Sequence, residues 1–197
     1  NKGNALSDLQ RYEQALAAYD RALALDPQDA AAWYNKGVRL RDLKRPVEAL
    51  AAFERALALD PQNAVVWNGK GNALFDLNRK EEALAAYDRV LALDPQYAAV
   101  WYNKGVALSN LKRFEEALAA CDRALALDPN DAVAWNNKGV VLGNLKRYEQ
   151  ALAAYDRALA LNAKYALAWD NKAITLRKLG RKAEAQEAER RARALSG

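Results

Sequence analysis

The chain has no histidine, no methionine and a single cysteine among its 197 residues. A single cysteine excludes an internal disulfide, and without histidine there is no Cys/His cluster of the kind that binds zinc. Histidine is also the usual general base near neutral pH. The sequence contains neither a phosphate-binding glycine loop nor a serine-based nucleophile motif. It therefore argues against an enzyme and predicts no cofactor and no metal site.

Long apolar runs are also missing. No stretch approaches the roughly 18 consecutive apolar residues that indicate a membrane-spanning helix, and no signal peptide is visible. We therefore expect no membrane partner and a cytoplasmic location. Because the first residue is Asn1 rather than methionine, we also expect the chain to be a segment of a longer protein.

The excess of charge of one sign is modest: 30 Lys and Arg residues against 25 Asp and Glu residues give a formal net charge of +5. A basic protein can attract an acidic partner or nucleic acid. Here the basic residues are interleaved with acidic ones, and few exposed aromatic side chains are expected for stacking on bases. This pattern indicates a solvated surface and argues against nucleic-acid binding.

What the sequence has in abundance is a repeat. The pentad WYNKG at residues 33–37 returns with small changes, each time 34 residues later. The later copies are at residues 67–71, 101–105, 135–139 and 169–173. A fixed period of this length indicates an array of repeats rather than one closed core. We predict a single array over residues 1–197, with units 1–29 (truncated at its front), 30–63, 64–97, 98–131, 132–165 and 166–197.

Each complete unit is predicted to hold two helices. In the first complete unit these run over about residues 30–43 and 46–59, where apolar residues recur at three- and four-residue steps. Asp-Pro pairs end the second helices, and Asp29, Asn63 and Asp131 stand at N-cap positions. The turns inside the units are predicted around Arg11, Arg45, Arg79, Arg113 and Arg147.

Small residues recur at fixed places in the two helices of a unit. Gly37 and Ala49 have the counterparts Gly3/Ala15, Gly71/Ala83, Gly105/Ala117 and Gly139/Ala151. Antiparallel helices approach closely only where side chains are small. We expect large residues such as Trp33 and Phe53 to fill the space between neighbouring pairs. Cys121 stands where other units have an aromatic residue, so we expect it to be buried and unreactive.

This pattern resembles the tetratricopeptide repeat. In the first complete unit the matching residues are Trp33, Gly37, Ala49, Phe53, Ala56 and Pro61. The resemblance covers essentially the whole chain. It implies an all-α fold, a right-handed solenoid (α-α superhelix) of antiparallel helix pairs whose first helices line the concave side. Cys121 in an aromatic position and Ala163 in place of the closing proline depart from the pattern without threatening the assignment.

A lysine stands before each repeat glycine, and before Ala173 in the last unit, where the family usually has leucine. These lysines are Lys2, Lys36, Lys70, Lys104, Lys138 and Lys172. We expect each stem to lie along the seam between units with its ammonium group turned outward. The predicted partners are acidic residues of the preceding second helix, namely Asp20, Glu54, Asp88, Asp122 and Asp156. A basic row that binds a partner is the alternative.

The first helices also carry candidate contacts for a peptide, on the side away from tryptophan and glycine. Asparagine amides donate and accept hydrogen bonds, so a row of them can bond the backbone of an extended peptide. Tyrosine adds contact area and valine adds apolar pockets. The predicted peptide-binding residues are Asn35, Asn103, Asn137, Asn171, Tyr34, Asn68, Tyr102, Asn136, Asn72, Val38, Val106 and Val140. The alternative is that these asparagines bond neighbouring helices to one another.

The two ends of the array differ. The last second helix has Gln186, Glu189 and Arg193 where inner units are apolar, which predicts a polar cap. The front begins midway through a first helix. This predicts that further repeats or another domain precede Asn1, or that this end docks onto another copy.

These observations predict a non-catalytic protein–protein interaction scaffold that holds an extended or helical peptide of a partner. Family members that grip chaperone C-terminal tails need basic residues on the first helices, where this chain has Ala31, Val65 and Tyr34. Such tails are therefore not expected to bind. The alternatives are a self-assembling repeat module, and a regulatory domain of a larger protein whose catalytic part lies upstream.

Overall fold

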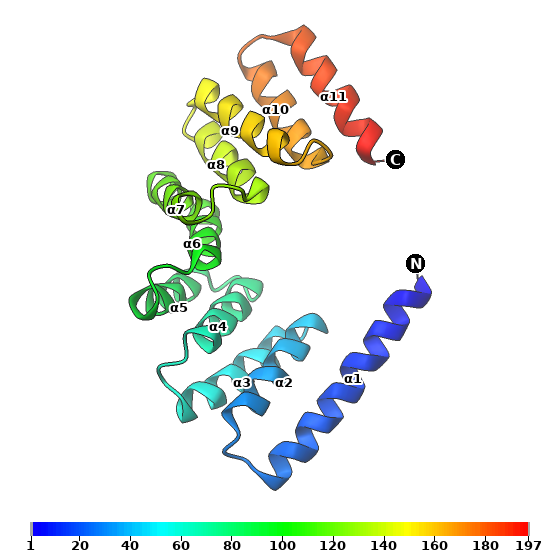
Figure 1. Cartoon of the computed structure of the whole chain (residues 1–197), viewed down its shortest axis with the longest axis vertical. Helices are drawn as coiled ribbons and strands as arrows, with labels where there is room; N and C mark the ends of the chain where they lie inside the picture. The colour runs from blue at the N-terminus through cyan, green and yellow to red at the C-terminus, as the bar shows by residue number, and fades with distance from the viewer. Residues whose placement is uncertain (1, 197) are drawn as a thin grey trace. The chain divides into compact units, whose positions relative to one another are not determined.

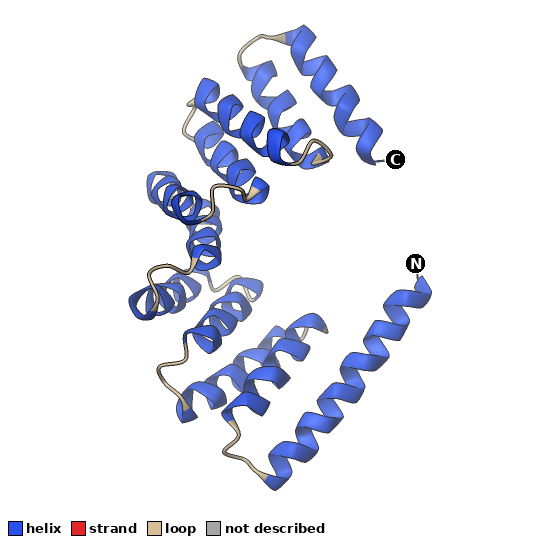
Figure 2. Cartoon of the chain, in the orientation of Figure 1, coloured by secondary structure: helices blue, strands red, loops and turns tan. Residues whose placement is uncertain are grey.

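All regular elements in the described part of the chain are α-helices (Figure 2). The computed structural model describes the backbone of residues 2–196 and the side chains of residues 11–195. The chain divides into two units, residues 1–95 and residues 96–197, and each is described by itself. The predicted all-α class is confirmed.

The first unit contains five helices (Figure 1). They are α1 (Lys2–Leu25), α2 (Ala30–Asp42), α3 (Pro46–Leu59), α4 (Ala64–Asp76) and α5 (Lys80–Leu93). Helices α2 and α3 form one antiparallel pair, and α4 and α5 form the next. Helix α1 packs on α2, α3 packs on α4, and the first helices α2 and α4 also touch.

The second unit repeats this arrangement with six helices. They are α6 (Ala98–Asn110), α7 (Phe114–Leu127), α8 (Ala132–Asn144), α9 (Tyr148–Leu161), α10 (Ala166–Lys178) and α11 (Lys182–Ser196). The pairs are α6 with α7, α8 with α9, and α10 with α11, and the first helices α6, α8 and α10 touch in sequence. Throughout both units, first helices begin at the residues where the repeats begin.

Helix starts follow the predicted caps. The Asp29 carboxylate accepts a hydrogen bond from the Ala32 amide at 2.9 Å, and the Asn63 side chain accepts one from the Val66 amide at 3.3 Å. Asp131 accepts from the amides of both Val133 and Ala134 at 2.7 and 3.0 Å. The three predicted N-caps are therefore confirmed, and each satisfies amide groups that have no partner within the helix.

The turn inside each complete repeat depends on one left-handed residue. Lys44 has φ 59°, and its amide donates to the Arg41 carbonyl while the Arg45 amide donates to the Leu40 carbonyl, both at 2.9 Å. This is the Schellman arrangement, which satisfies carbonyl groups at the end of the first helix. The other left-handed turn residues are Asn78, Lys112, Lys146 and Gly180.

Helix α1 lacks this turn. It is continuous from Lys2 to Leu25 (Figure 1), so the turn predicted around Arg11 was wrong. A left-handed residue is unfavourable by about 1–2 kcal/mol unless it is glycine. In complete repeats the packing of a whole first helix against the second offsets that strain.

The core of three complete repeats is an aromatic ring packed on a glycine. Phe53 is fully buried, and a Cβ atom placed on Gly37 would lie only 2.7 Å from its ring. The rings of Tyr87 and Tyr155 occupy the same place over Gly71 and Gly139. The predicted pairing of small and large residues is confirmed. Cys121 takes the same place and is buried, as predicted, and burial raises the pKa of its thiol to about 12.

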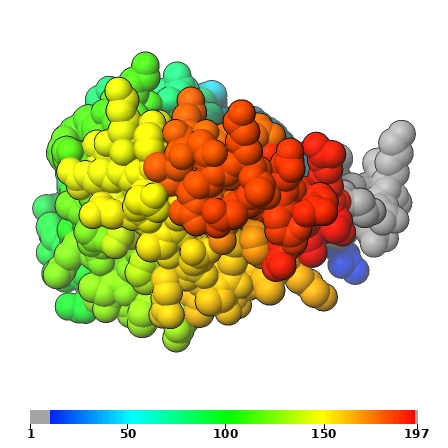
Figure 3. Space-filling view, turned by 90° about the horizontal axis from the view of Figure 1, so that it is seen from above, coloured from blue at the N-terminus to red at the C-terminus, as the bar shows by residue number. Residues whose placement is uncertain are grey.

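Helix α11 packs on α10 through three alanines, Ala185, Ala188 and Ala192, which are all buried. In the space-filling view of Figure 3 it lies at the surface of the second unit. The side chains of Gln186 and Arg193 are exposed, and Glu189 is paired with Arg177. The outward side of this helix is therefore polar, as its sequence indicated.

Candidate functional site

The repeated tryptophans are structural. Four of the tryptophans donate the indole N–H to the backbone carbonyl of the residue six positions earlier. The bonds are Trp33 to Pro27, Trp67 to Pro61, Trp135 to Pro129 and Trp169 to Ala163, at 2.9–3.1 Å. Ala163 accepts this bond as well as proline does, because only its carbonyl is used. Each bond ties a first helix to the loop before it, so the recurrence of tryptophan needs no ligand to explain it.

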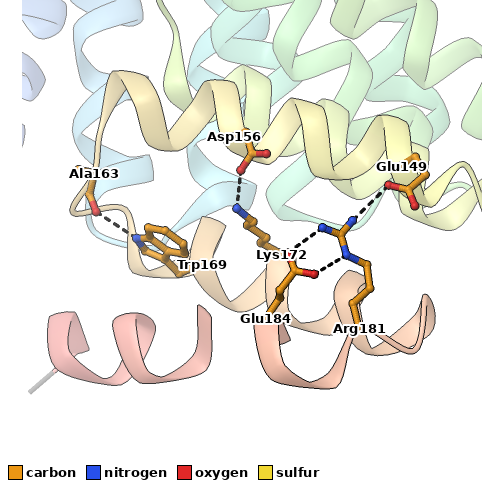
Figure 4. Close-up of polar contacts among 7 residues, drawn as sticks. All are labelled: Glu149, Asp156, Ala163, Trp169, Lys172, Arg181 and Glu184. Carbon is orange, nitrogen blue, oxygen red and sulfur yellow. Dashed lines mark hydrogen bonds and ion pairs between the residues drawn. The ribbon is translucent and has the colours of Figure 1, made fainter. Parts of the chain in front are cut away.

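The lysines beside them hold neighbouring repeats together. Lys36 Nζ lies 2.6 Å from Asp20 Oδ1, and the counterparts pair in the same way. These are Lys70 with Glu54 at 3.0 Å, Lys138 with Asp122 at 2.7 Å, and Lys172 with Asp156 at 2.5 Å (Figure 4). The hypothesis that these lysines pair with acids of the preceding second helix is confirmed for these four. Each ammonium group also lies 5.2–5.4 Å from the centroid of its own tryptophan ring.

The first helices of the second unit present a mixed apolar and polar surface, which we call the first-helix face. It is formed by α6, α8 and α10, at positions spaced by three and four residues. Three of its apolar side chains are strongly exposed, namely Val133 at 45%, Leu167 at 53% and Ile174 at 54%. Val106 and Val140, both predicted contacts, are half-buried on the same helices. Apolar side chains exposed together mark a surface suited to binding.

The predicted asparagine row is partly used within the protein. Asn171 Nδ2 donates to Asn136 Oδ1 at 3.0 Å, which links α10 to α8. Asn137 Nδ2 donates to Cys121 Sγ at 3.4 Å, across the seam to α7. Asn136 itself is only 5% exposed. Bonding between neighbouring helices, the alternative given above, is thus found for these side chains, and Asn136 offers a partner almost no surface.

The remaining predicted residues are half-buried on their helices. In the first unit, Asn72 accepts a hydrogen bond from the Tyr87 hydroxyl at 2.8 Å, and the ring of Tyr34 lies 6.0 Å from that of Phe53. Asn35, Asn68 and Val38 lie on the same two first helices, α2 and α4. In the second unit, Tyr102 and Asn103 lie on α6, and burial raises the pKa of the Tyr102 hydroxyl.

A hollow of about 350 Å³ opens on the first-helix face between α8 and α10. We call it the α8–α10 hollow. Its lining includes Val140, Asn144, Lys146, Asn171, Ile174 and Lys178. No carboxylate in the described part of the chain pairs with Lys146 or Lys178. The hollow therefore combines an exposed isoleucine with two uncompensated positive charges.

The corresponding place in the first unit contains an ion pair. There Arg41 Nε donates to Asp76 Oδ2 at 2.7 Å. Three repeats later the counterparts are Gly143 and Lys178. The residue types that fill and neutralise the first site are thus absent from the second. Sequence reasoning missed Lys146 and Lys178. Comparing the same position in successive repeats would have shown the change from Asp76 to Lys178, whereas Lys146 has the lysine counterparts Lys44 and Lys112.

Within residues 11–195, no group of Cys, Asp and Glu side chains is arranged to hold a metal ion. Among the described helices, none combines the length and the apolar character needed to cross a membrane.

Comparison with known families agrees with the geometry of the helix pairs. A model of the tetratricopeptide repeat matches residues 1–64 and 68–132, and two further models of this repeat match residues 132–165 and 40–92. The chain belongs to the tetratricopeptide repeat family. No curated protein matches this tetratricopeptide repeat chain as a relative.

Solved structures share the fold. PilW, a widely conserved type IV pilus biogenesis factor, superposes with a TM-score of 0.86 at 27% identity, over 94% of this chain and 86% of its own. YrrB, described as a tetratricopeptide repeat protein with an unusual peptide-binding site, gives 0.73 at 25% identity over 90% and 92%. MamA from Desulfovibrio magneticus RS-1 gives 0.79 at 22% identity over 85% and 94%. The family and these neighbours support a protein-interaction scaffold.

Proposed function

We propose that this tetratricopeptide repeat chain is a non-catalytic scaffold whose first-helix face binds an extended or helical peptide segment of a partner protein. The observation that supports this most directly is the α8–α10 hollow, where Ile174 is 54% exposed between Lys146 and Lys178. An isolated exposed apolar residue has no special meaning, but one that lies in a polar-rimmed hollow is typical of a binding site.

The chemistry of the hollow indicates the type of segment that it would accept. Burying Ile174 and Val140 beneath an apolar side chain of the partner contributes about 25 cal/mol per Å² of apolar surface removed from water. The two lysine ammonium groups favour acidic residues beside that side chain and speed the encounter with them. Asn144 and Asn171 offer amide groups for the peptide backbone. The proposed ligand is a peptide with an apolar residue flanked by acids.

The proposal also includes the first unit, where the same repeat positions hold similar residues. Asn35 and Val38 on α2 stand where Asn137 and Val140 stand on α8. In the first unit Arg41 is paired with Asp76 where the hollow has Gly143 and Lys178, so we assign the acidic part of the ligand to the second unit. The predicted contacts in the first unit, including Tyr34, Asn68 and Asn72, are assigned to the peptide backbone and to apolar side chains.

A display selection of peptides against the whole chain tests the proposal. Selected peptides would then be titrated against Ile174→Asp, Lys178→Glu and a matched control, Val47→Asp, which changes a valine 67% exposed on α3. We expect both hollow variants to weaken binding at least tenfold, because each removes apolar area or reverses a charge. The control should bind as the unchanged chain does. Equal affinity for all variants would refute the proposal.

A further inference from the structure

A second hollow lies away from the first-helix face, between the second helices α7 and α9. We call it the α7–α9 hollow, and its volume is about 440 Å³. Its lining includes Leu118 on α7, Trp135 and Leu142 on α8, and Gln150, Ala153 and Arg157 on α9. None of these residues belongs to the first-helix face, so the hollow is independent of the function proposed above.

The repeats themselves supply a comparison for this place. Successive second helices follow one another four times within the two units, so the same position can be compared in four places. The leucine that corresponds to Leu118 is buried at the other three seams: Leu16 is 5% exposed, Leu50 is 7% exposed and Leu152 is 5% exposed. Leu118 is only half-buried. The α7–α9 seam is therefore the one that leaves its leucine open.

A change of one residue accompanies this opening. At the other three seams an arginine of the turn donates a hydrogen bond to the glutamate three residues later, with Nε–Oε1 distances of 2.7 Å. The pairs are Arg45 with Glu48, Arg79 with Glu82, and Arg181 with Glu184 (the last in Figure 4). At the α7–α9 seam the glutamate is replaced by Gln150. Arg147 keeps only the contact with the preceding second helix, to Glu115 at 3.2 Å, which Arg45 and Arg181 also make with Glu13 and Glu149. Gln150 therefore does not form the arginine–glutamate pair found at the other three seams.

The replacement also changes the charge of the hollow. Lys138 is neutralised by Asp122 at 2.7 Å. The Arg157 guanidinium lies 5.8 Å from the centroid of the Trp135 ring, and no carboxylate of the described residues pairs with it. Because Gln150 has no charge, the hollow keeps one uncompensated positive charge beside an apolar floor. The small side chain of Ala153, which is exposed, leaves access to that floor.

We propose that the α7–α9 hollow is a second docking site, which binds a peptide segment that presents one large apolar side chain next to a carboxylate. The apolar side chain packs on Leu118, Leu142 and the edge of Trp135. The adjacent carboxylate pairs with Arg157, whose guanidinium is already held against the indole ring. The scaffold would then hold two segments at once, one on each surface of the second unit.

The test uses a fluorescein-labelled peptide, Gly-Glu-Leu-Phe-Glu-Gly, and the whole chain labelled with ¹⁵N. We expect saturable binding that shifts the indole N–H signal of Trp135. Two variants should weaken binding of the peptide at least tenfold. Ala153→Glu fills the entrance to the hollow and repels the carboxylate of the peptide, and Gln150→Glu restores the glutamate found at the other seams. The matched control is Ala85→Glu, the same change at the same position of α5 in the first unit, and it should leave binding unchanged.

Further comparisons separate this site from the α8–α10 hollow. Ile174→Asp should keep the Trp135 shift, since that residue lies on the first-helix face. A peptide with both glutamates replaced by lysines should bind at least tenfold more weakly. An unmoved Trp135 signal, equal binding of the lysine peptide, or full binding by Ala153→Glu would each overturn the proposal. So would a dimer of the unchanged chain that Ala153→Glu abolishes, since the occupant would then be a second copy.

Discussion

Lys36 Nζ lies 2.6 Å from Asp20 Oδ1 and 5.2 Å from the centroid of the Trp33 ring, so a single ammonium group bridges two repeats. The same arrangement recurs at Lys70, Lys138 and Lys172. The family usually has leucine here, and the lysine replaces apolar burial by an ion pair and a cation–π contact.

Replacing Lys138 by methionine removes both contacts while keeping the stem. A partly exposed ion pair contributes about 0.2–1 kcal/mol and a cation–π contact about 0.5–1 kcal/mol. We expect Lys138→Met to lower the free energy of unfolding in urea by about 1 kcal/mol, and less in 1 M salt because the charges are screened. Lys164→Met, a change at an exposed loop residue, is the control. A variant more stable than the unchanged chain would contradict this account.

Glycine in the first helices is required only where an aromatic ring covers it. A Cβ atom on Gly139 would lie 2.4 Å from the Tyr155 ring, whereas one on Gly105 would lie 3.2 Å from Cys121 Sγ. Overpacking is unfavourable by about 1–3 kcal/mol, and alanine favours a helix over glycine by about 1 kcal/mol. Gly139→Ala should therefore be clearly destabilised in urea unfolding and Gly105→Ala should stay close to the unchanged chain. Equal losses would show that the rings do not decide the position.

The left-handed turn residues predict a gain in stability. Lys112 has φ 60° and Gly180 has φ 75° at the same position of their repeats. Relief of left-handed strain outweighs the added freedom of glycine in the unfolded chain. We expect Lys112→Gly to raise the thermal midpoint by a few degrees and Gly180→Ala to lower it, although a Cβ at Gly180 meets nothing within 4 Å. The opposite order of midpoints would argue against the strain.

The buried thiol predicts a pH dependence. Burial raises the pKa of Cys121 from 9.0 to about 12. Between these values the unfolded chain loses the thiol proton while the folded chain keeps it, so stability falls as the pH rises, by up to about 1.4 kcal/mol per pH unit. The contribution is fully present below pH 9. Stability measured from pH 8 to 11 should therefore fall less steeply for Cys121→Val than for the unchanged chain; parallel curves would contradict the shift.

The period of the tryptophans was enough to predict most of the fold. Helix starts at Ala30 and Ala132, the N-caps Asp29 and Asn63, and the ring on Gly37 all follow from contacts within one repeat or its immediate neighbour. Such contacts recur with the period, so six copies of one pattern confirm one another. The ion pairs of the lysine row were predictable for the same reason.

Other features became visible only in the tertiary structure, at positions where one repeat differs from the rest. The turn expected at Arg11 is absent, since α1 runs without a break from Lys2 to Leu25. Asn136 looks like a surface amide in the sequence but is covered by the packing of α10 on α8. Each of these outcomes depends on how other helices pack against the residue. The type and spacing of residues in the sequence do not predict that packing.

The sequence by itself thus determined the repeat, the helix pairs and the contacts that hold each seam, because these are local and periodic. The tertiary structure decided where the seams stay open. The α8–α10 hollow and the half-buried Leu118 accompany single departures, such as Lys178 and Gln150, which come together only when helices from different parts of the chain meet. Binding sites in a repeat protein depend on such departures, since a perfectly regular seam buries its own apolar residues and pairs its own charges.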